Sequence, residues 1–145
     1  MRIIHRILGT NIVLSKMKMT PSDLCTFGCQ EKETIEHLFW LCNHATLFWQ
    51  QLEDRIHDKC AHAAQFNFSM ALVLLGHVSG FNSDDICDFI VLLGKYFIYK
   101  CRCEKKVPTC TGFVNYLKAR YVIEKHVAML SLHFDIFREK WQIYM

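Results

Sequence analysis

The chain has 145 residues, of which 52% are hydrophobic, and this is enough for one ordinary domain with its own core. The formal net charge of +3 conceals a basic–acidic–basic layout, since residues 1–18 and 95–125 are rich in Lys and Arg whereas residues 23–58 are acidic. No signal-peptide pattern and no segment suited to a membrane helix is found. Eight cysteines in such a chain predict a reducing environment, and hence an intracellular protein, cytoplasmic or nuclear, without membrane contact.

Hydrophobic residues recur at helical spacing along most of the chain, and no internal repeat or low-complexity tract interrupts them. We therefore expect a mainly α fold, a small helical domain with an irregular Cys/His zinc-binding loop near the N-terminus. Its two regions, residues 1–59 and 60–145, should form one cooperative unit. The predicted helices span residues 2–8, 11–17, 34–41, 43–59, 111–129 and 131–143, with one more between Ser83 and Pro108.

Polar residues mark where three of these helices should begin, because Thr10, Asn43 and Ser83 are all favoured N-cap types. Asp84 and Asp85 then suit the positive end of the helix dipole. Adjacent aspartates also occur in two-metal phosphoryl-transfer sites, but a polymerase would need a third carboxylate on another strand. Helix capping is therefore the favoured interpretation of this acidic pair.

The segment LCTFGCQEKETIEHLFWLC, residues 24–42, contains three cysteines and one histidine with the spacing Cys-x3-Cys-x7-His-x4-Cys. Zinc takes four sulfur or nitrogen donors at tetrahedral corners, commonly two from a tight loop and two from a nearby helix. Gly28 permits the backbone to turn so that the sulfur atoms on either side of it point inward. The pattern predicts one structural Zn²⁺, bound by Cys25, Cys29, His37 and Cys42.

The alternative is that these four side chains simply pack in the interior. His37 and Cys42 lie five residues apart, about 140° around an ideal helix, so they converge only if the helix bends or ends between them. Asn43, as the cap of a new helix, would supply that break.

Other side chains of the metal-binding or base-stacking types are assigned structural roles. Cys101, Cys103 and Cys110 have no fourth ligand nearby in sequence, so we interpret them as core and surface thiols rather than a second metal site. Trp40 and Trp49 stand on predicted amphipathic helices, where aromatic residues usually belong to the core.

The metal-ligand segment also carries a resemblance to a known family. CTFGC, followed by ETIEHLFWLC and the aromatic pair Phe48 and Trp49, resembles the zinc-binding segment downstream of the reverse transcriptase in LINE-type, especially L1-like, retrotransposon polyproteins. KYFIYKCR at 95–102 and NYLKARYVIEK at 115–125 resemble the tail of the same second open reading frame product. The resemblance covers nearly the whole chain. It implies the end of a larger protein, with zinc on the Cys/His set and a role in holding element RNA.

The sequence shows no phosphate loop, no nucleophile with a recognisable base and no paired general acid and base, so we do not expect an enzyme. Two function classes remain. The first is a module that binds RNA or single-stranded nucleic acid weakly, through charge. The second is a structural module that braces a neighbouring reverse transcriptase domain without contacting nucleic acid. The residues expected to contact nucleic acid are Lys95, Lys100, Arg102, Lys105, Lys106, Lys118 and Arg120.

Overall fold

The structure is a computed structural model that describes residues 8–59, 67–76, 85–131 and 133–141. Helices dominate these residues, which confirms the predicted mainly α class. The predicted helix over 2–8 and the predicted caps Ser83 and Asp84 lie outside the described residues, apart from Leu8. The elements are α1 (Asn11–Lys16), the π-helix η1 (His37–Leu41), α2 (Asn43–Lys59), α3 (Met70–Leu75), α4 (Asp85–Cys103), α5 (Cys110–Ser131) and α6 (Phe134–Trp141).

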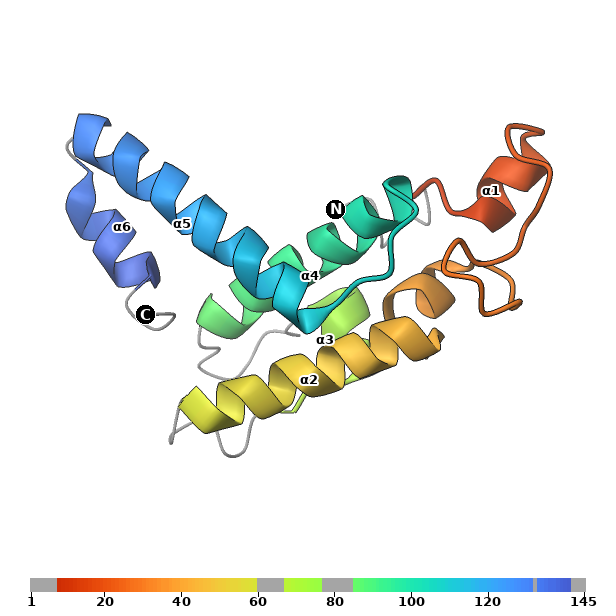
Figure 1. The fold of residues 1–145 in the computed structure, drawn as a ribbon, viewed down its shortest axis with the longest axis horizontal. Helices are drawn as coiled ribbons and strands as arrows, with labels where there is room; N and C mark the ends of the chain where they lie inside the picture. Colours follow the sequence, from red (N-terminus) through yellow and green to blue (C-terminus); the bar gives the residue numbers. More distant parts are fainter. Residues whose placement is uncertain (1–7, 60–66, 77–84, 132, 142–145) are drawn as a thin grey trace.

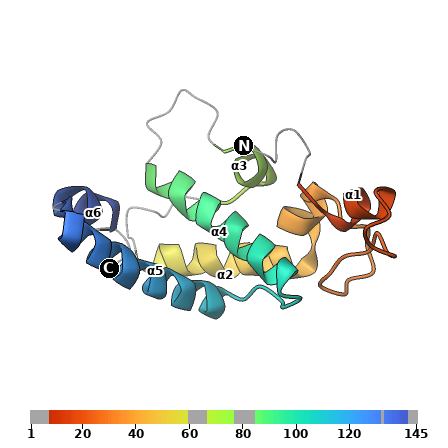
Figure 2. The same ribbon diagram turned by 90° about the horizontal axis from the view of Figure 1, so that it is seen from above.

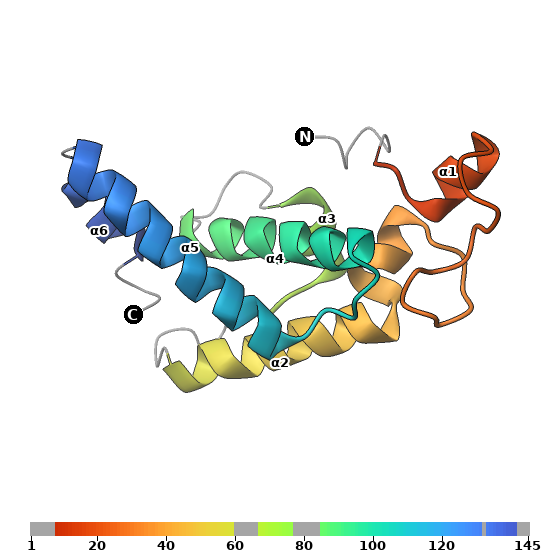
Figure 3. The ribbon, with the colours of Figure 1, turned by 45° about the horizontal axis from the view of Figure 1, so that its top comes forward.

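The molecule is elongated, with α1 and the cysteine-bearing loop at one end, and α5 runs from the middle to the other end, where it meets α6 (Figures 1 and 2). Helices α2, α3 and α4 form the middle, where α3 packs against α4 (Figure 3). The π-helix η1 contacts α2, α3 and α4, so the segment that carries His37 is attached directly to the helical body.

Three phenylalanines from three helices form the centre of the core. Phe48 of α2, Phe97 of α4 and Phe113 of α5 lie with ring centroids 5.4 to 6.0 Å apart. Trp49 is fully buried beside them, which confirms its predicted core role, and its indole N–H donates to the carbonyl of Phe39. Burial of these large rings supplies much of the stabilisation of the three-helix contact.

The close approach of α2 to α4 depends on a glycine. A Cβ atom at Gly94 would lie 2.5 and 2.8 Å from ring atoms of Trp49, closer than real Cβ atoms come to other atoms. The indole therefore occupies the space that any other side chain at this position would need. Helix α4 carries a glycine in its interior, at a cost in helix propensity, because this packing requires it.

Helix α3 was not among the predicted helices, since only a short apolar run marked it in the sequence. Ser69 caps it, with its side-chain oxygen accepting from the backbone N–H of Leu72, and Val73 is fully buried. Six residues are too few to be stable in isolation, so contact with α4 and η1 holds this helix in place.

Helices α5 and α6 pack through a second, smaller cluster. Tyr121 contacts the rings of Phe137 and Trp141, and the indole N–H of Trp141 donates to Glu124 at 2.9 Å. Phe89 of α4 meets Trp141 edge to face and so connects this cluster to the rest of the molecule.

The main core crosses the boundary at residue 59 between the two regions expected from the sequence. It unites Cys25, Phe27 and Leu38 on one side with Phe97 and Phe113 on the other. Whether both regions unfold together stays a prediction. Among the helices of the described residues, none has the length and apolar character needed to cross a membrane.

Candidate metal centre

A small hairpin presents the first two cysteines. Its arms are joined by backbone hydrogen bonds from Cys25 to Glu31 and from Glu33 to Asp23, with a bridge between the intervening residues. At its tip Gly28 adopts a φ of +84°, as its role in the predicted turn requires, and its N–H donates to the carbonyl of Cys25. The backbone N–H of Phe27 approaches the Cys25 sulfur at 3.4 Å. The turn thus brings backbone donors toward a sulfur atom.

His37 begins the π-helix. Thr34 starts the preceding turn, with its hydroxyl accepting from the N–H of His37 and its carbonyl accepting from the N–H of Leu38. The N–H of Cys42 then donates to the carbonyl of His37, an i to i+5 bond of 2.8 Å. The predicted break between His37 and Cys42 is therefore present, and the π turn is the means by which their side chains converge.

Cys42 is the N-cap of α2, one residue before the predicted cap at Asn43. Its backbone is extended, and its carbonyl accepts the first helical bond from Thr46. Burial raises the pKa of its thiol, and the backbone N–H groups of Ala45 and His44 oppose this with a smaller lowering effect. A thiolate here gains from these donors and from the positive end of the α2 dipole.

The four predicted ligands converge, with their donor atoms all within 4.8 Å of one another. The Cys42 sulfur lies 3.9 Å from that of Cys25 and 3.8 Å from that of Cys29. A tetrahedral site with Zn–S bonds of about 2.3 Å has S···S edges of about 3.8 Å. These two separations therefore match a zinc site without rearrangement.

The contact between the Cys29 sulfur and His37 Nε2 is shorter, at 2.9 Å. The corresponding S···N edge of a zinc tetrahedron is about 3.5 Å, so these two atoms lie in direct hydrogen-bonding contact, closer than the edge. A shift of about 0.6 Å at the hairpin tip converts the hydrogen bond to a tetrahedral edge. Cys29 is the half-buried member of the set, at the tip, where the least packing opposes such a shift.

Burial determines the protonation states of the cysteine thiols and of the His37 imidazole. It raises the pKa of the Cys25 thiol to about 12 and also raises the pKa of Cys42, against the backbone donors that lower it. Burial lowers the pKa of His37 despite nearby Glu31 and Glu33, which keeps the imidazole neutral and its nitrogen lone pair available. Three thiols clustered beside a neutral imidazole form a donor set that suits zinc, because a divalent ion compensates the charge of ionised sulfur.

A buried carboxylate fixes this centre to the rest of the fold. Glu33 is fully buried, and its two oxygens accept from the backbone N–H of Asn11, the backbone N–H and hydroxyl of Thr26, and the guanidinium of Arg102. Arg102 also donates to the side chain of Asn11 at 2.8 Å. One side chain thus joins α1, the cysteine hairpin and α4, a role that no local sequence pattern indicates.

Two of the predicted nucleic-acid-binding residues are not on the surface, and the prediction is corrected for them. Lys95 is 4% exposed on α4, and burial lowers its pKa although Asp88 opposes this. An ammonium group in that position does not reach a phosphate. Arg102 has a side chain 10% exposed and forms the ion pair with Glu33 at 2.8 Å.

The other five predicted residues reach solvent, but three have acidic partners. Lys100 and Lys106 flank Glu104 at 3.8 and 3.0 Å, and Arg120 pairs with its i+4 neighbour on α5. The remaining two, Lys105 and Lys118, are exposed. With two of the seven predicted cations withdrawn from the surface, five can still face an anionic partner, because exposed ion pairs are weak.

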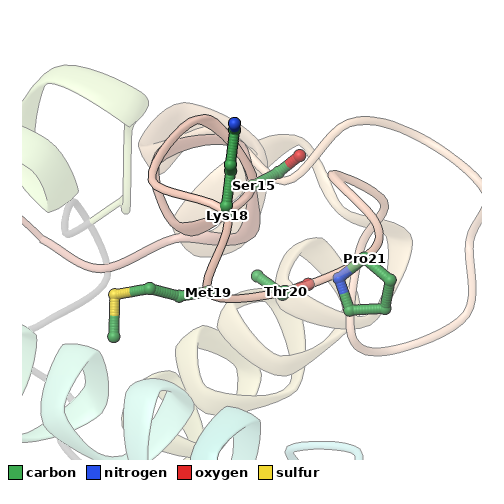
Figure 4. A pocket seen from close by; sticks show the side chains of 5 residues that line it. All are labelled: Ser15, Lys18, Met19, Thr20 and Pro21. Carbon is green, nitrogen blue, oxygen red and sulfur yellow. The ribbon is translucent and has the colours of Figure 1, made fainter.

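The remaining candidate features carry less chemistry. Cys101 and Cys110 are buried, with burial raising the pKa of both, whereas Cys103 is exposed, so the three sulfur atoms lie in different environments. An open depression beside the end of α1 is lined by one charged side chain, Lys18, and by small or apolar neighbours (Figure 4). It presents no cluster of polar groups around a ligand position.

Comparison with protein-family models and with curated proteins found no match.

Proposed function

We propose that the chain is a non-catalytic module whose N-terminal half is organised by one structural Zn²⁺. The observation that carries the proposal is the convergence of Cys25, Cys29, His37 and Cys42, with two sulfur separations at the length of a zinc tetrahedron edge. When bound, the ion would supply charge compensation for the thiolates and a cross-link between the hairpin and α2. Four protein ligands leave no open position for water or substrate, which supports a structural rather than a catalytic role.

The metal assignment is tested by measuring zinc in purified protein and in Cys25→Ser and Cys42→Ser variants. We expect one zinc per parent chain and a loss of affinity of more than a hundredfold in either variant, since each removes one of four ligands. The exposed Cys103→Ser variant is the matched control and should retain full zinc content. Equal zinc content in all four proteins would refute the assignment.

The partner that best fits the surface and the LINE-type resemblance is RNA or another single-stranded nucleic acid, bound weakly through charge. Lys100, Lys105 and Lys106 stand together at the end of α4, and Lys118 stands on α5. Exposed ion pairs contribute only about 0 to 1 kcal/mol, so Glu104 does not withdraw its two lysines from a phosphate partner. If about four phosphates are neutralised, log affinity should fall with log salt at a slope near −3.

A salt series with a triple variant, Lys100, Lys105 and Lys106 to Gln, tests this charge-driven binding. We expect the slope to fall from about −3 to about −1, because each contact to a single strand contributes about 0.7. The control has the same charge change elsewhere, with Lys16, Lys18 and Lys32 changed to Gln, and it should keep the parent slope. Lys18 and Lys105 both have positive φ, so the two variants are also matched in backbone.

The alternative function, bracing a neighbouring polymerase domain, is favoured by a separate observation. The second half of α5 and the start of α6 expose large apolar side chains, each at least 56% accessible: Val122, Ile123, Val127, Met129, Leu130 and Ile136. Clustered exposed apolar residues mark protein interaction surfaces. Replacing Ile123 and Leu130 with Ser should leave RNA binding intact in the first function and abolish binding to an added polymerase domain in the second.

We further propose that no polymerase or nuclease activity resides in this chain. Of the adjacent acidic residues of the sequence, Asp85 is the first residue of α4, and Asp84 lies outside the described residues. Charge at a helix N-terminus is sufficient to explain them. Primer extension above background that disappears in an Asp85→Asn variant would contradict this.

A further inference from the structure

Two helices each present one tyrosine and one basic side chain to the same surface. On α4, Tyr96 is followed four residues later by Lys100, and on α5, Tyr116 is followed four residues later by Arg120. Residues at i and i+4 lie on one face of a helix, so each helix offers a ring with a cation beside it. The two tyrosine rings meet across the helices, with centroids 6.0 Å apart and planes inclined at 31°.

The four side chains are held in register by direct contacts. The Lys100 ammonium lies 5.6 Å from the centre of the Tyr116 ring, in the range of a cation–π contact. Arg120 donates to the Tyr116 hydroxyl at 3.2 Å and to Glu124 at 2.7 Å. A guanidinium has five N–H donors, so this arrangement orients Arg120 and leaves donors for a further acceptor.

The exposure of the rings is uneven. Tyr96 is 55% exposed, whereas Tyr116 is half-buried and continues inward to the rings of Phe97 and Phe113. Tyr116 therefore stands on the core as a rigid support, and Tyr96 offers much of its surface to solvent. Core packing explains Tyr116, but it does not explain why a large ring at position 96 stays outside, against Tyr116 and one helical turn before Lys100.

We propose that Tyr96, supported by Tyr116, is a stacking platform for an unpaired base, and that Lys100 and Arg120 contact the flanking phosphates. This inference rests on the proposed nucleic-acid binding and adds where and how a single strand is held. An aromatic face with adjacent cations suits single strands of any sequence, because every base has a π-face and every nucleotide a phosphate. A duplex does not suit it, since its bases already stack on one another.

The test compares three labelled probes of equal length by fluorescence anisotropy: an oligouridylate of about twelve nucleotides, an abasic ribose-phosphate chain and an RNA duplex. We expect the parent chain to bind the oligouridylate roughly 5- to 150-fold more tightly than the abasic chain, the range expected for stacking of one base. Tyr96→Ala and Tyr96→Leu should reduce oligouridylate binding to the abasic level and leave abasic binding unchanged. Tyr96→Phe keeps the ring and should keep the preference.

The outcomes separate the two proposals. Equal, salt-dependent binding of the oligouridylate and the abasic chain by the parent overturns the platform and leaves charge-driven binding standing. Absence of binding to any probe overturns both and leaves protein docking as the better account of the surface. Loss of the base preference in Tyr96→Phe as well as in Tyr96→Leu also overturns the platform, since the ring face is unchanged in the first. Because Tyr96 is exposed, these variants should fold, and circular dichroism verifies that they do.

Discussion

Replacing Glu33 with Gln should destabilise the protein more than any other change of a single carboxylate in the cysteine hairpin. The glutamine side chain has the same shape but no charge, and one of its two acceptor oxygens becomes an NH2 donor. Whichever way the amide turns, this donor faces groups that themselves donate, either at Thr26 or at Asn11 and Arg102. The variant therefore loses an acceptor and leaves a buried guanidinium without its counter-charge.

The magnitude follows from the burial of the pair. The Glu33 side chain is 0% exposed and that of Arg102 is 10% exposed, so solvent screens the interaction little. Removing one partner of a buried ion pair costs about 3 to 5 kcal/mol, because the remaining charge is left uncompensated. Glu31 lies two residues away on the same hairpin but is exposed. Its change to Gln should cost less than about 0.5 kcal/mol.

Urea unfolding of the zinc-loaded protein, followed by tryptophan fluorescence and circular dichroism, measures both variants. Equal free energies of unfolding for Glu33→Gln and Glu31→Gln, within about 0.5 kcal/mol, would refute the reasoning. A double-mutant cycle with Arg102→Gln separates the ion pair from the hydrogen bonds to Thr26. We expect a coupling energy of at least about 1 kcal/mol between positions 33 and 102.

The same comparison has a pH dependence of known sign. Burial raises the pKa of Glu33, but hydrogen bonds from Thr26 and Arg102 outweigh it, and the net pKa lies below the ordinary 4.5. A carboxyl whose pKa is lower in the folded state stabilises fully above its unfolded pKa, and this stabilisation disappears as pH falls through the folded pKa. The difference in stability between the parent and Glu33→Gln should therefore shrink below about pH 4.5.

Three further substitutions test the packing by the same urea assay. Gly94→Ala should cost about 1 to 3 kcal/mol, because the new methyl group overlaps the Trp49 ring, and an unchanged midpoint would contradict that contact. Thr10→Val should stabilise by about 1 kcal/mol, since the buried Thr10 hydroxyl has no hydrogen-bond partner within the described residues, and a loss of stability would show that this hydroxyl is satisfied. Trp141→Phe should lower the free energy of unfolding by about 1 to 2 kcal/mol, because it removes the hydrogen bond to Glu124. An unchanged free energy of unfolding would show that this hydrogen bond contributes nothing measurable.

The ligand set was predictable because its information is local. Cys25 and Cys29 belong to one tight turn, and Gly28 indicates that turn in the sequence because glycine tolerates positive φ. The backbone conformation that positions His37 and Cys42 could not be predicted in detail. A π turn depends on tertiary contacts that oppose the usual i to i+4 pattern, and cysteine is an uncommon N-cap, so Asn43 was the more natural choice than Cys42.

The start of α1 after Thr10 was predicted correctly, but not the hydrogen bond that stabilises it. Thr10 stands immediately before α1 in extended conformation, as predicted for an N-cap, but its side chain makes no capping hydrogen bond. The carboxylate of Glu33 takes the backbone N–H of Asn11 in its place. A donor satisfied from 22 residues away is a tertiary interaction, and local sequence preference does not contain it.

The burial of Lys95 could not be predicted from the hydrophobic periodicity of α4 alone. Hydrophobic residues recur at helical spacing along α4, and Ile90, Leu93 and Phe97 of this series are buried. Such a pattern assumes one covered face, whereas α4 contacts aromatic side chains of α2 and also packs against α3. A lysine expected in solvent is therefore buried at 4% exposure on a helix that has more than one covered face.

The fold explains part of the uneven distribution of charge along the sequence. The acidic segment contributes Glu33 and the basic segment contributes Arg102, and these two residues, 69 positions apart, form the buried pair that joins the metal centre to α4. Part of the separation of charge along the chain therefore serves internal pairing and not an external partner. With Lys95 and Arg102 withdrawn, five of the seven predicted cations remain accessible, so contact with a single strand can neutralise at most five phosphates through them. The salt slope for this surface should accordingly be no steeper than about −3.5, and a steeper slope would require cations other than these five.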